Sequence, residues 1–189
     1  MGSFTWPGSD RASDRLAVLL PGTGYTAKAP LLYWCAELLV QQGWRVEAVE
    51  WVISDDARRN PRAFVEAEVD LAFAAASNAP GRLVVGKSFG SYALPWAVDS
   101  NVPGLWLTPI LTDPEICDAL ATAPASHLAI GGGVDPMWAP SVTLATAAQM
   151  VTIEGADHSL LVDGDWRASR ACQTEALETV SRQTERFLR

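Results

Sequence analysis

The chain is poor in the residues that build disulfide frameworks and metal sites. Of its 189 residues, three are cysteines and two are histidines. Cys35, Cys117 and Cys172 lie far apart and form no Cys-x-x-Cys pair, and their odd number argues against a disulfide framework. With two histidines and no His pair, a structural zinc site is not expected either. We therefore expect no metal, and thiols that serve as small packing residues.

Basic clusters and long apolar runs are also missing. Lys and Arg total 14 against 22 Asp and Glu, for a net charge of −8. An acidic chain without a basic cluster is a poor ligand for nucleic acid or an anionic membrane. Apolar runs such as residues 16–20 are too short to cross a bilayer, and residues 1–8 lack the basic start and apolar stretch of a secretory signal. We expect a cytoplasmic protein with no nucleic-acid or membrane partner, and its oligomeric state stays open.

What the sequence does contain is a regular alternation of apolar strands and amphipathic helices. Strands are expected at residues 16–20, 44–52, 82–85, 104–107, 127–130 and 149–153, and helices at 31–42, 62–77, 91–98, after 114 and at 168–188. Strands that are apolar throughout and alternate with helices predict a mostly parallel sheet covered on both faces. The fold class is thus α/β, a three-layer α/β/α sandwich of about six strands. Residues 1–189 form one domain, with residues 1–15 loosely structured.

Two glycine motifs suggest a nucleotide, but neither has the required context. Residues 81–88 match the phosphate-loop pattern G-x-x-x-x-G-K-[ST], yet the four intervening residues include the expected strand and cannot also wrap a phosphate. Residues 22–27 match the dinucleotide pattern G-x-G-x-x-[GA], yet residues 28–30 separate them from the next helix. The helix dipole would then not face a pyrophosphate. A dinucleotide- or nucleotide-binding α/β protein remains the alternative.

A third motif does lie between the elements that it requires. Residues 86–90 read Gly-Lys-Ser-Phe-Gly, the G-x-S-x-G pattern of a nucleophile elbow, with a strand before it and a helix after it. A serine needs a base, and the base needs an acid that fixes its tautomer. Asp135 follows the fifth expected strand and His158 follows the sixth, which is the order that this architecture requires. Ser88, Asp135 and His158 are therefore the candidate catalytic residues.

Other residues could compete for two of these roles. His127 opens a strand, which favours a structural or surface role for it. Asp113 precedes Pro114 in the pattern of a helix N-cap, and this role accounts for it. Asp157 is next to the histidine in sequence and is expected to point elsewhere. Asp135 follows three glycines, a backbone permissive enough to turn its carboxylate toward the His158 loop.

The chain resembles the α/β-hydrolase superfamily, in particular small members without a cap domain, similar to serine-containing relatives of dienelactone hydrolases. Gly-Lys-Ser-Phe-Gly and the Gly-Ala-Asp-His-Ser of residues 155–159 carry the resemblance, which extends from residue 16 to the last helix. Two departures stand out: Pro21 replaces the His of a common His-Gly pair, and Ser88 stands where a dienelactone hydrolase is expected to have Cys. No segment between the fourth and fifth strands is long enough for a lid.

The resemblance implies Ser88 as nucleophile, His158 as base and Asp135 as acid. It also implies an oxyanion hole that pairs the N–H of Phe89 with one from the loop at residues 21–25. Thr23, Gly24 and Tyr25 are the candidate donors in that loop.

The expected activity is hydrolysis of a small carboxylic ester, thioester or amide through an acyl-enzyme, with no cofactor. Four residues beside the catalytic loops could line the substrate site: Tyr25, Thr26, Met137 and Trp138. A hydrolase fold used only for binding is a further alternative, in which Ser88 would be unreactive.

Overall fold

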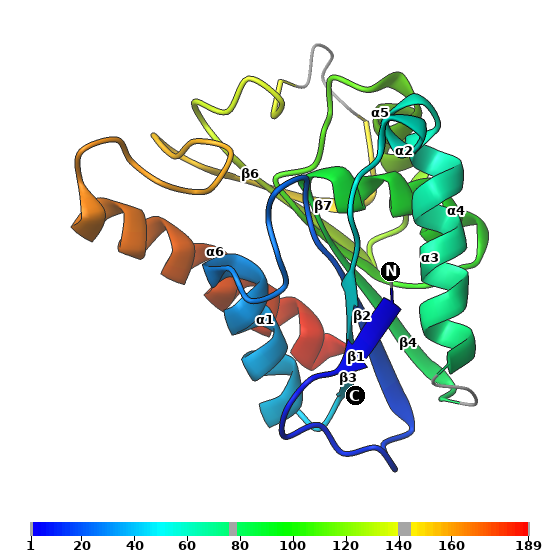
Figure 1. Ribbon diagram of the computed structural model, residues 1–189. Helices are drawn as coiled ribbons and strands as arrows, with labels where there is room; N and C mark the ends of the chain where they lie inside the picture. The colour runs from blue at the N-terminus through cyan, green and yellow to red at the C-terminus, as the bar shows by residue number, and fades with distance from the viewer. Residues whose placement is uncertain (1, 76–78, 140–144, 189) are drawn as a thin grey trace.

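A computed structural model describes residues 2–75, 79–139 and 145–188 of the chain. Strands and helices alternate along it (Figure 1). The strands are β1 (Gly2–Thr5), β2 (Arg15–Leu20), β3 (Arg45–Glu50), β4 (Gly81–Lys87), β5 (Gly104–Leu107), β6 (His127–Gly132) and β7 (Gln149–Ile153). The helices are α1 (Pro30–Gln41), α2 (Asp55–Arg59), α3 (Pro61–Ala75), the 3₁₀ helix η1 (Ser88–Ala93), α4 (Leu94–Asp99), α5 (Pro114–Thr122) and α6 (Trp166–Arg186).

All the strands form one sheet in the order β1-β3-β2-β4-β5-β6-β7. Every neighbouring pair is parallel except β1 and β3, which are antiparallel. β4 lies at the centre of the sheet and is paired on both sides, with Lys87 at its end opposite Leu107 of β5. The expectation of a mostly parallel sheet in an α/β/α sandwich is confirmed, with seven strands instead of about six.

Each face of the sheet carries its own hydrophobic core. Along β4, Leu83 and Val85 belong to the core beneath α1 and α6, whereas Val84 belongs to the core beneath α3, α4 and α5. This alternation follows from the two-residue period of a strand. Figure 1 shows α1 and α6 lying together on one side of the sheet and α3 and α4 on the other. The central strands β2, β4, β5 and β6 are mainly apolar because both of their faces are buried.

In the first third of the chain one expectation was wrong and one short helix was not predicted. Residues 2–5 are not loosely structured: they form β1, which pairs with β3, and Trp6 behind them is 4% exposed. A short helix, α2, follows Ser54, whose hydroxyl accepts a hydrogen bond from the Ala57 N–H and caps it. The expected end of the following helix at residue 77 lies outside the described residues.

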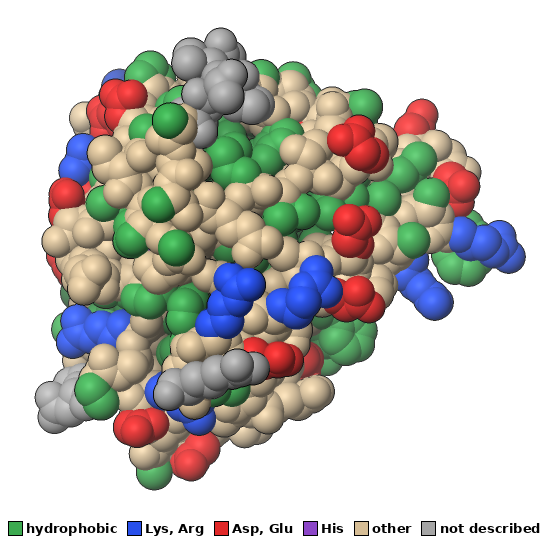
Figure 2. Space-filling view, turned by 180° about the vertical axis from the view of Figure 1, so that it is seen from behind, with side chains coloured by type: hydrophobic (Ala, Val, Ile, Leu, Met, Phe, Trp, Pro, Cys, Tyr) green, Lys and Arg blue, Asp and Glu red, His purple; other side chains and the backbone are tan. Residues whose placement is uncertain are grey.

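On the face of the molecule in Figure 2, Lys and Arg side chains lie among Asp and Glu side chains. Within residues 2–75, 79–139 and 145–188, no helix combines the length and the apolarity needed to cross a bilayer.

Candidate active site

Ser88 lies at the end of β4, on a turn that leads directly into η1. Its φ is +52°, a left-handed conformation that is uncommon for a residue other than glycine. Glycines on either side make this turn possible. A Cβ on Gly86 would lie 2.7 Å from the Gly90 carbonyl oxygen, and a Cβ on Gly90 would collide with the Leu20 carbonyl oxygen of β2. The tight packing therefore requires both glycines of the motif and presents Ser88 at the carboxyl edge of the sheet.

His158 and Asp135 meet Ser88 there, although 70 and 23 residues separate His158 from the other two in sequence. The His158 Nε2 lies 2.8 Å from the Ser88 Oγ, and its Nδ1 lies 2.7 Å from the Asp135 Oδ2. A carboxylate only accepts hydrogen bonds, so the His158 Nδ1 carries a proton and donates a hydrogen bond to Asp135. Nε2 is then the free base, and the Ser88 hydroxyl donates to it. The three side chains form one continuous hydrogen-bonded chain.

The Asp135 carboxylate is enclosed by its own loop. Its side chain has no exposed surface, and its second oxygen, Oδ1, accepts a hydrogen bond of 2.9 Å from the Met137 N–H. The glycines of this loop bring it against the His158 loop, since a Cβ on Gly132 would collide with the Ala156 carbonyl oxygen. The buried carboxylate can thus hold the His158 ring in one orientation.

The competing acids and the second histidine are occupied elsewhere. Asp113 caps α5, with Oδ1 accepting from the Glu115 N–H at 3.0 Å, and its Oδ2 accepts from the Tyr92 hydroxyl at 2.8 Å. Asp157 accepts hydrogen bonds through Oδ1 from backbone N–H groups of its own loop. His127 is buried at the start of β6, at the opposite end of that strand from Asp135.

The loop after β2 lies against Ser88. A Cβ on Gly22 would be 3.1 Å from the Ser88 Cβ, so the backbone of this loop passes directly beside the nucleophile. Among the three candidate oxyanion donors in the loop, the Tyr25 N–H is used by a turn, since it donates to the Gly22 carbonyl at 3.3 Å. The N–H groups of Thr23 and Gly24 have no hydrogen-bond partner in the described part of the chain.

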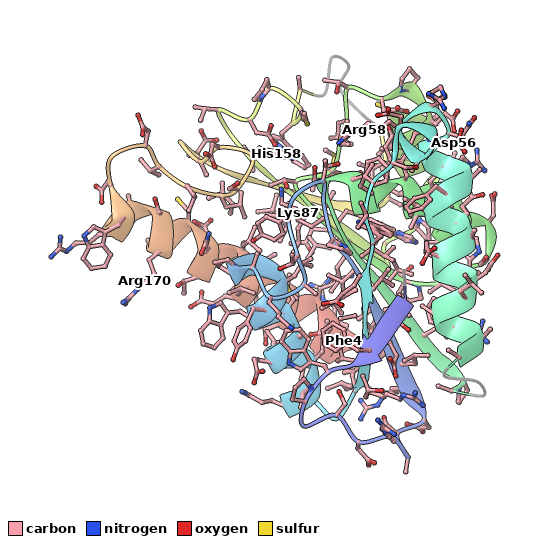
Figure 3. The ribbon with its side chains drawn as sticks, viewed as in Figure 1. Phe4, Asp56, Arg58, Lys87, His158 and Arg170 are labelled. Carbon is pink, nitrogen blue, oxygen red and sulfur yellow. The ribbon has the colours of Figure 1, made fainter. Side chains whose placement is uncertain are left out.

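The same loop lines a cavity of about 560 Å³. Its walls are residues 21–27, the end of β3 with the segment that follows it (residues 49–53), and Arg58 of α2. Tyr25 and Thr26, which the sequence suggested as substrate-lining residues, are among them. Figure 3 labels Arg58, Lys87 and His158, which come from α2, β4 and the loop after β7.

Trp138 and Met137, the other two residues suggested for the substrate site, do not line this cavity. Trp138 is 6% exposed, packs in the core on the α3 side of the sheet and donates from Nε1 to the Thr152 hydroxyl at 2.9 Å. Gly131 leaves the space that its ring fills, because a Cβ there would overlap the ring. The Met137 side chain is exposed. Trp138 is therefore a packing residue.

Sequence reasoning missed two contributions to this region. The segment of residues 51–53, together with Arg58, forms a cavity wall, but no motif marks it. Lys87 is 3% exposed, and burial lowers the pKa of its ammonium group to about 8, although the carboxylates of Asp135 and Asp157 act in the opposite direction. A buried lysine directly before the candidate nucleophile was visible in the sequence, but its partners were not.

The two glycine patterns that suggested a nucleotide lack the geometry for one. Residues 81–87 form β4 itself, so the phosphate-loop pattern has no loop, and α1 begins at Pro30, well after the glycines of residues 22–24. Within the described residues, no group of three or more His, Cys, Asp or Glu side chains is arranged to hold a metal ion. The three cysteines are free thiols, and Cys35 is fully buried.

Similarity to known proteins is confined to three-dimensional structure. No protein-family model matches the sequence, and no curated protein matches it either. The chain superimposes on Est1E from Butyrivibrio proteoclasticus, solved with ferulic acid bound, with a TM-score of 0.66 and 14% identity, covering 97% of this chain and 95% of that one. It also superimposes on XC6422 from Xanthomonas campestris, described as an α/β serine hydrolase without a lid, with a TM-score of 0.59 and 15% identity over 98% and 87% of the two chains.

A dienelactone hydrolase from Anabaena variabilis is a further structural neighbour, with a TM-score of 0.57 and 19% identity over 90% and 87% of the two chains. These identities are too low to transfer an activity, but the coverage is nearly complete in both directions. The chain therefore has the α/β-hydrolase fold, in a form without a lid.

Proposed function

We propose that the protein is a serine hydrolase that cleaves a small carboxylic ester, or a related thioester or amide, through an acyl-enzyme intermediate. One observation supports this above all: the hydrogen-bonded chain from Asp135 through His158 to Ser88, with distances of 2.7 and 2.8 Å. These three groups come from three separate loops, and each has the role that acyl transfer requires. A cluster that served only to pack the core, or only to form surface hydrogen bonds, would not need to end in a serine held on a strained turn.

The reaction begins when the Ser88 Oγ attacks the carbonyl carbon and His158 Nε2 accepts its proton. Asp135 stabilises the imidazolium that forms, and His158 then returns the proton to the leaving group. In the second half, His158 activates a water molecule that attacks the acyl-enzyme and releases the acid. No cofactor enters these steps.

The developing oxyanion needs N–H donors near Ser88. Phe89 is the second residue of η1, and the first N–H groups of a helix have no partner within it. We assign the Phe89 N–H as one donor. The other comes from Thr23 or Gly24, because the Tyr25 N–H is already bonded to Gly22.

The cavity lined by the β2 loop is the proposed site for the acyl part of the substrate. Its apolar lining includes Trp51, Val52, Ile53, Tyr25 and Ala27, and Glu50 and Arg58 supply its charged groups. A volume of about 560 Å³ accommodates a short or medium acyl chain, including a ring. Substrates of this size are small molecules rather than nucleic acids or membrane lipids.

Labelling with a fluorophosphonate probe tests the nucleophile directly, because such probes modify only activated serines. We expect the wild-type protein to be labelled and to hydrolyse p-nitrophenyl acetate, and Ser88→Ala to lose both properties. The rate should fall on the order of 10⁴-fold or more, as is typical when a triad member is removed.

Ser100→Ala is the matched control, because Ser100 is an exposed residue at the end of α4. It should be labelled like the wild type. Activity of Ser88→Ala near the wild-type level would refute the proposal. A well-folded wild-type protein that is not labelled at all would instead favour a hydrolase fold used for binding.

A further inference from the structure

Lys87 contacts two loops of the proposed active site, the loop after β2 and the loop that carries His158. It is the last residue of β4, and its side chain points to the face of the sheet that carries α1 and α6, since it follows Val85 by two residues. Its Nζ donates a hydrogen bond of 3.1 Å to the backbone carbonyl of His158. The same Nζ lies 4.8 Å from the centroid of the Tyr25 ring, within the range of a cation–π interaction.

The Tyr25 ring is itself fixed at its other end. Its hydroxyl accepts a hydrogen bond of 3.0 Å from the Leu31 N–H in the first turn of α1. The stem of Lys87 passes against Gly22, where a Cβ would be 3.3 Å from the Lys87 Cδ. One side chain therefore contacts both the loop that carries the candidate oxyanion donors and the loop that carries the base. Figure 3 shows Lys87 below His158, between these two segments.

The charge of Lys87 is costly to bury and is nevertheless present. The residue is 3% exposed, and this burial lowers its pKa to about 8, so most molecules carry the ammonium at pH 7. The carboxylates of Asp135 and Asp157 stabilise its charge, and so does the π face of the Tyr25 ring. A methionine would fill the same space without the cost of burying a charge. A buried cation at this position thus needs an explanation beyond packing.

We propose that Lys87 is a positioning residue whose ammonium group fixes the His158 loop against the Tyr25 loop. This contact holds the His158 Nε2 in line with the Ser88 hydroxyl. The inference rests on the proposed function for its role in catalysis, but the placement of the His158 ring can be measured without it.

The test compares Lys87→Met with Lys28→Met. Methionine keeps the unbranched stem and removes the charge and the donors. Lys28 is a matched control, since it also lies over an aromatic ring, with Nζ 5.4 Å from the Phe4 centroid, but its side chain is exposed. For each variant, kcat and KM on p-nitrophenyl acetate are measured from pH 5 to 9, together with the melting temperature.

We expect Lys87→Met to lower kcat about 10²-fold with little change in KM, because a misplaced base costs about that much. Lys28→Met should match the wild type in both constants. A wild-type kcat in Lys87→Met, or a loss of activity that lies in KM rather than in kcat, would overturn the inference.

A second measurement needs no substrate and separates this inference from the proposed function. The chain has only two histidines, so the imidazole NMR signals, assigned with a His127→Asn variant, report on His158 alone. We expect the Nδ1–H signal of His158, which reports its hydrogen bond to Asp135, to shift or broaden in Lys87→Met at fixed pH and to be unchanged in Lys28→Met. An unchanged signal in Lys87→Met would also overturn the inference. A wild-type protein without hydrolase activity, in which Lys87→Met still shifts this signal, would refute only the proposed function.

Discussion

At the scale of single residues, the backbone around Ser88 is held in an unfavourable conformation by specific hydrogen bonds. A non-glycine residue at positive φ costs on the order of 1–3 kcal/mol. The Ser91 hydroxyl donates to the Ser88 carbonyl at 2.6 Å and accepts from the Ile110 N–H at 3.2 Å, which connects the turn to the segment after β5. The backbone conformation of Ser88 is thus held by one hydrogen bond within η1 and by another to the segment after β5. This conformation places the proposed nucleophile at the end of β4.

The acid of the triad can be tested by comparing two aspartates that both follow strands. Asp135→Asn should lower kcat on the order of 10⁴-fold, because the amide favours the wrong tautomer of His158. Asp113→Asn should change kcat little, since asparagine caps a helix as well as aspartate does and its NH2 group can donate to the Tyr92 hydroxyl oxygen in place of the present bond. Steady-state kinetics on p-nitrophenyl acetate measure both. If Asp113→Asn were the inactive variant, the assignment of the acid would be wrong.

The sequence was informative about the triad because order along the chain carries the signal. Ser88, Asp135 and His158 each follow a strand that is apolar enough to recognise, and parallel strands place the ends that follow them at one edge. The role of Lys87 depends on a contact with a carbonyl 71 residues away, and no local pattern encodes such a contact. The packing of Trp138 was missed for the same reason, since Gly131 and Thr152 decide it.

At the scale of elements, the sequence predicted the strands β2 to β7 and missed two short elements, β1 and α2. β2, β4, β5 and β6 are continuous apolar runs, whereas β1 is four residues long and only partly buried. β1 forms because β3 presents a free edge and because Trp6, just after it, is buried in the core. Helix α2 has five residues, too few to show a helical period. Short elements are fixed by their neighbours rather than by their own sequences.

The contact between η1 and β2 gives a test of the elbow as a packed unit. Gly90→Ala would place a Cβ against the carbonyl oxygen of Leu20, with the Leu20 Cβ at 2.9 Å. Backbone atoms of a central strand cannot move aside cheaply, so we expect a loss of about 1–3 kcal/mol in the free energy of unfolding. This corresponds to a melting temperature lower by several degrees. Thermal denaturation followed by circular dichroism measures it.

Gly2→Ala is the control for this substitution, because a Cβ on Gly2 would meet no atom within 4 Å. Gly2→Ala should have the same melting temperature as the wild type. A Gly90→Ala protein as stable as Gly2→Ala would show that η1 does not pack on β2 as described. In that case the glycine of the motif would be required for some reason other than close approach.

At the scale of the whole molecule, the two ends of the sheet have different tasks. The carboxyl ends of β4, β6 and β7 lead into the loops that carry the reactive groups, where Asp135 and Lys87 are buried as charges. The amino end of β6 carries His127, which is buried without a charge: its Nδ1 accepts a hydrogen bond of 3.1 Å from the Trp106 Nε1. Since Nδ1 accepts, the proton of the neutral ring is on Nε2. The fold therefore depends on keeping this histidine neutral.

This dependence predicts how acid destabilises the protein. Burial lowers the pKa of His127 to about 4, whereas a histidine in an unfolded chain titrates near 6.5. Between these values the unfolded chain binds more protons than the folded one, so stability falls as the pH drops through this window. The loss attributable to His127 reaches about 3 kcal/mol near pH 4. His127→Asn keeps an acceptor for Trp106 and cannot titrate, so its free energy of unfolding, measured with urea from pH 7 to pH 4.5, should decline less steeply than that of the wild type. Ser88, Asp135 and His158 are intact in both proteins, so their contributions cancel in the difference. Parallel curves for the two proteins would mean that His127 is already charged in the folded state, and that its bond with Trp106 is not the one described.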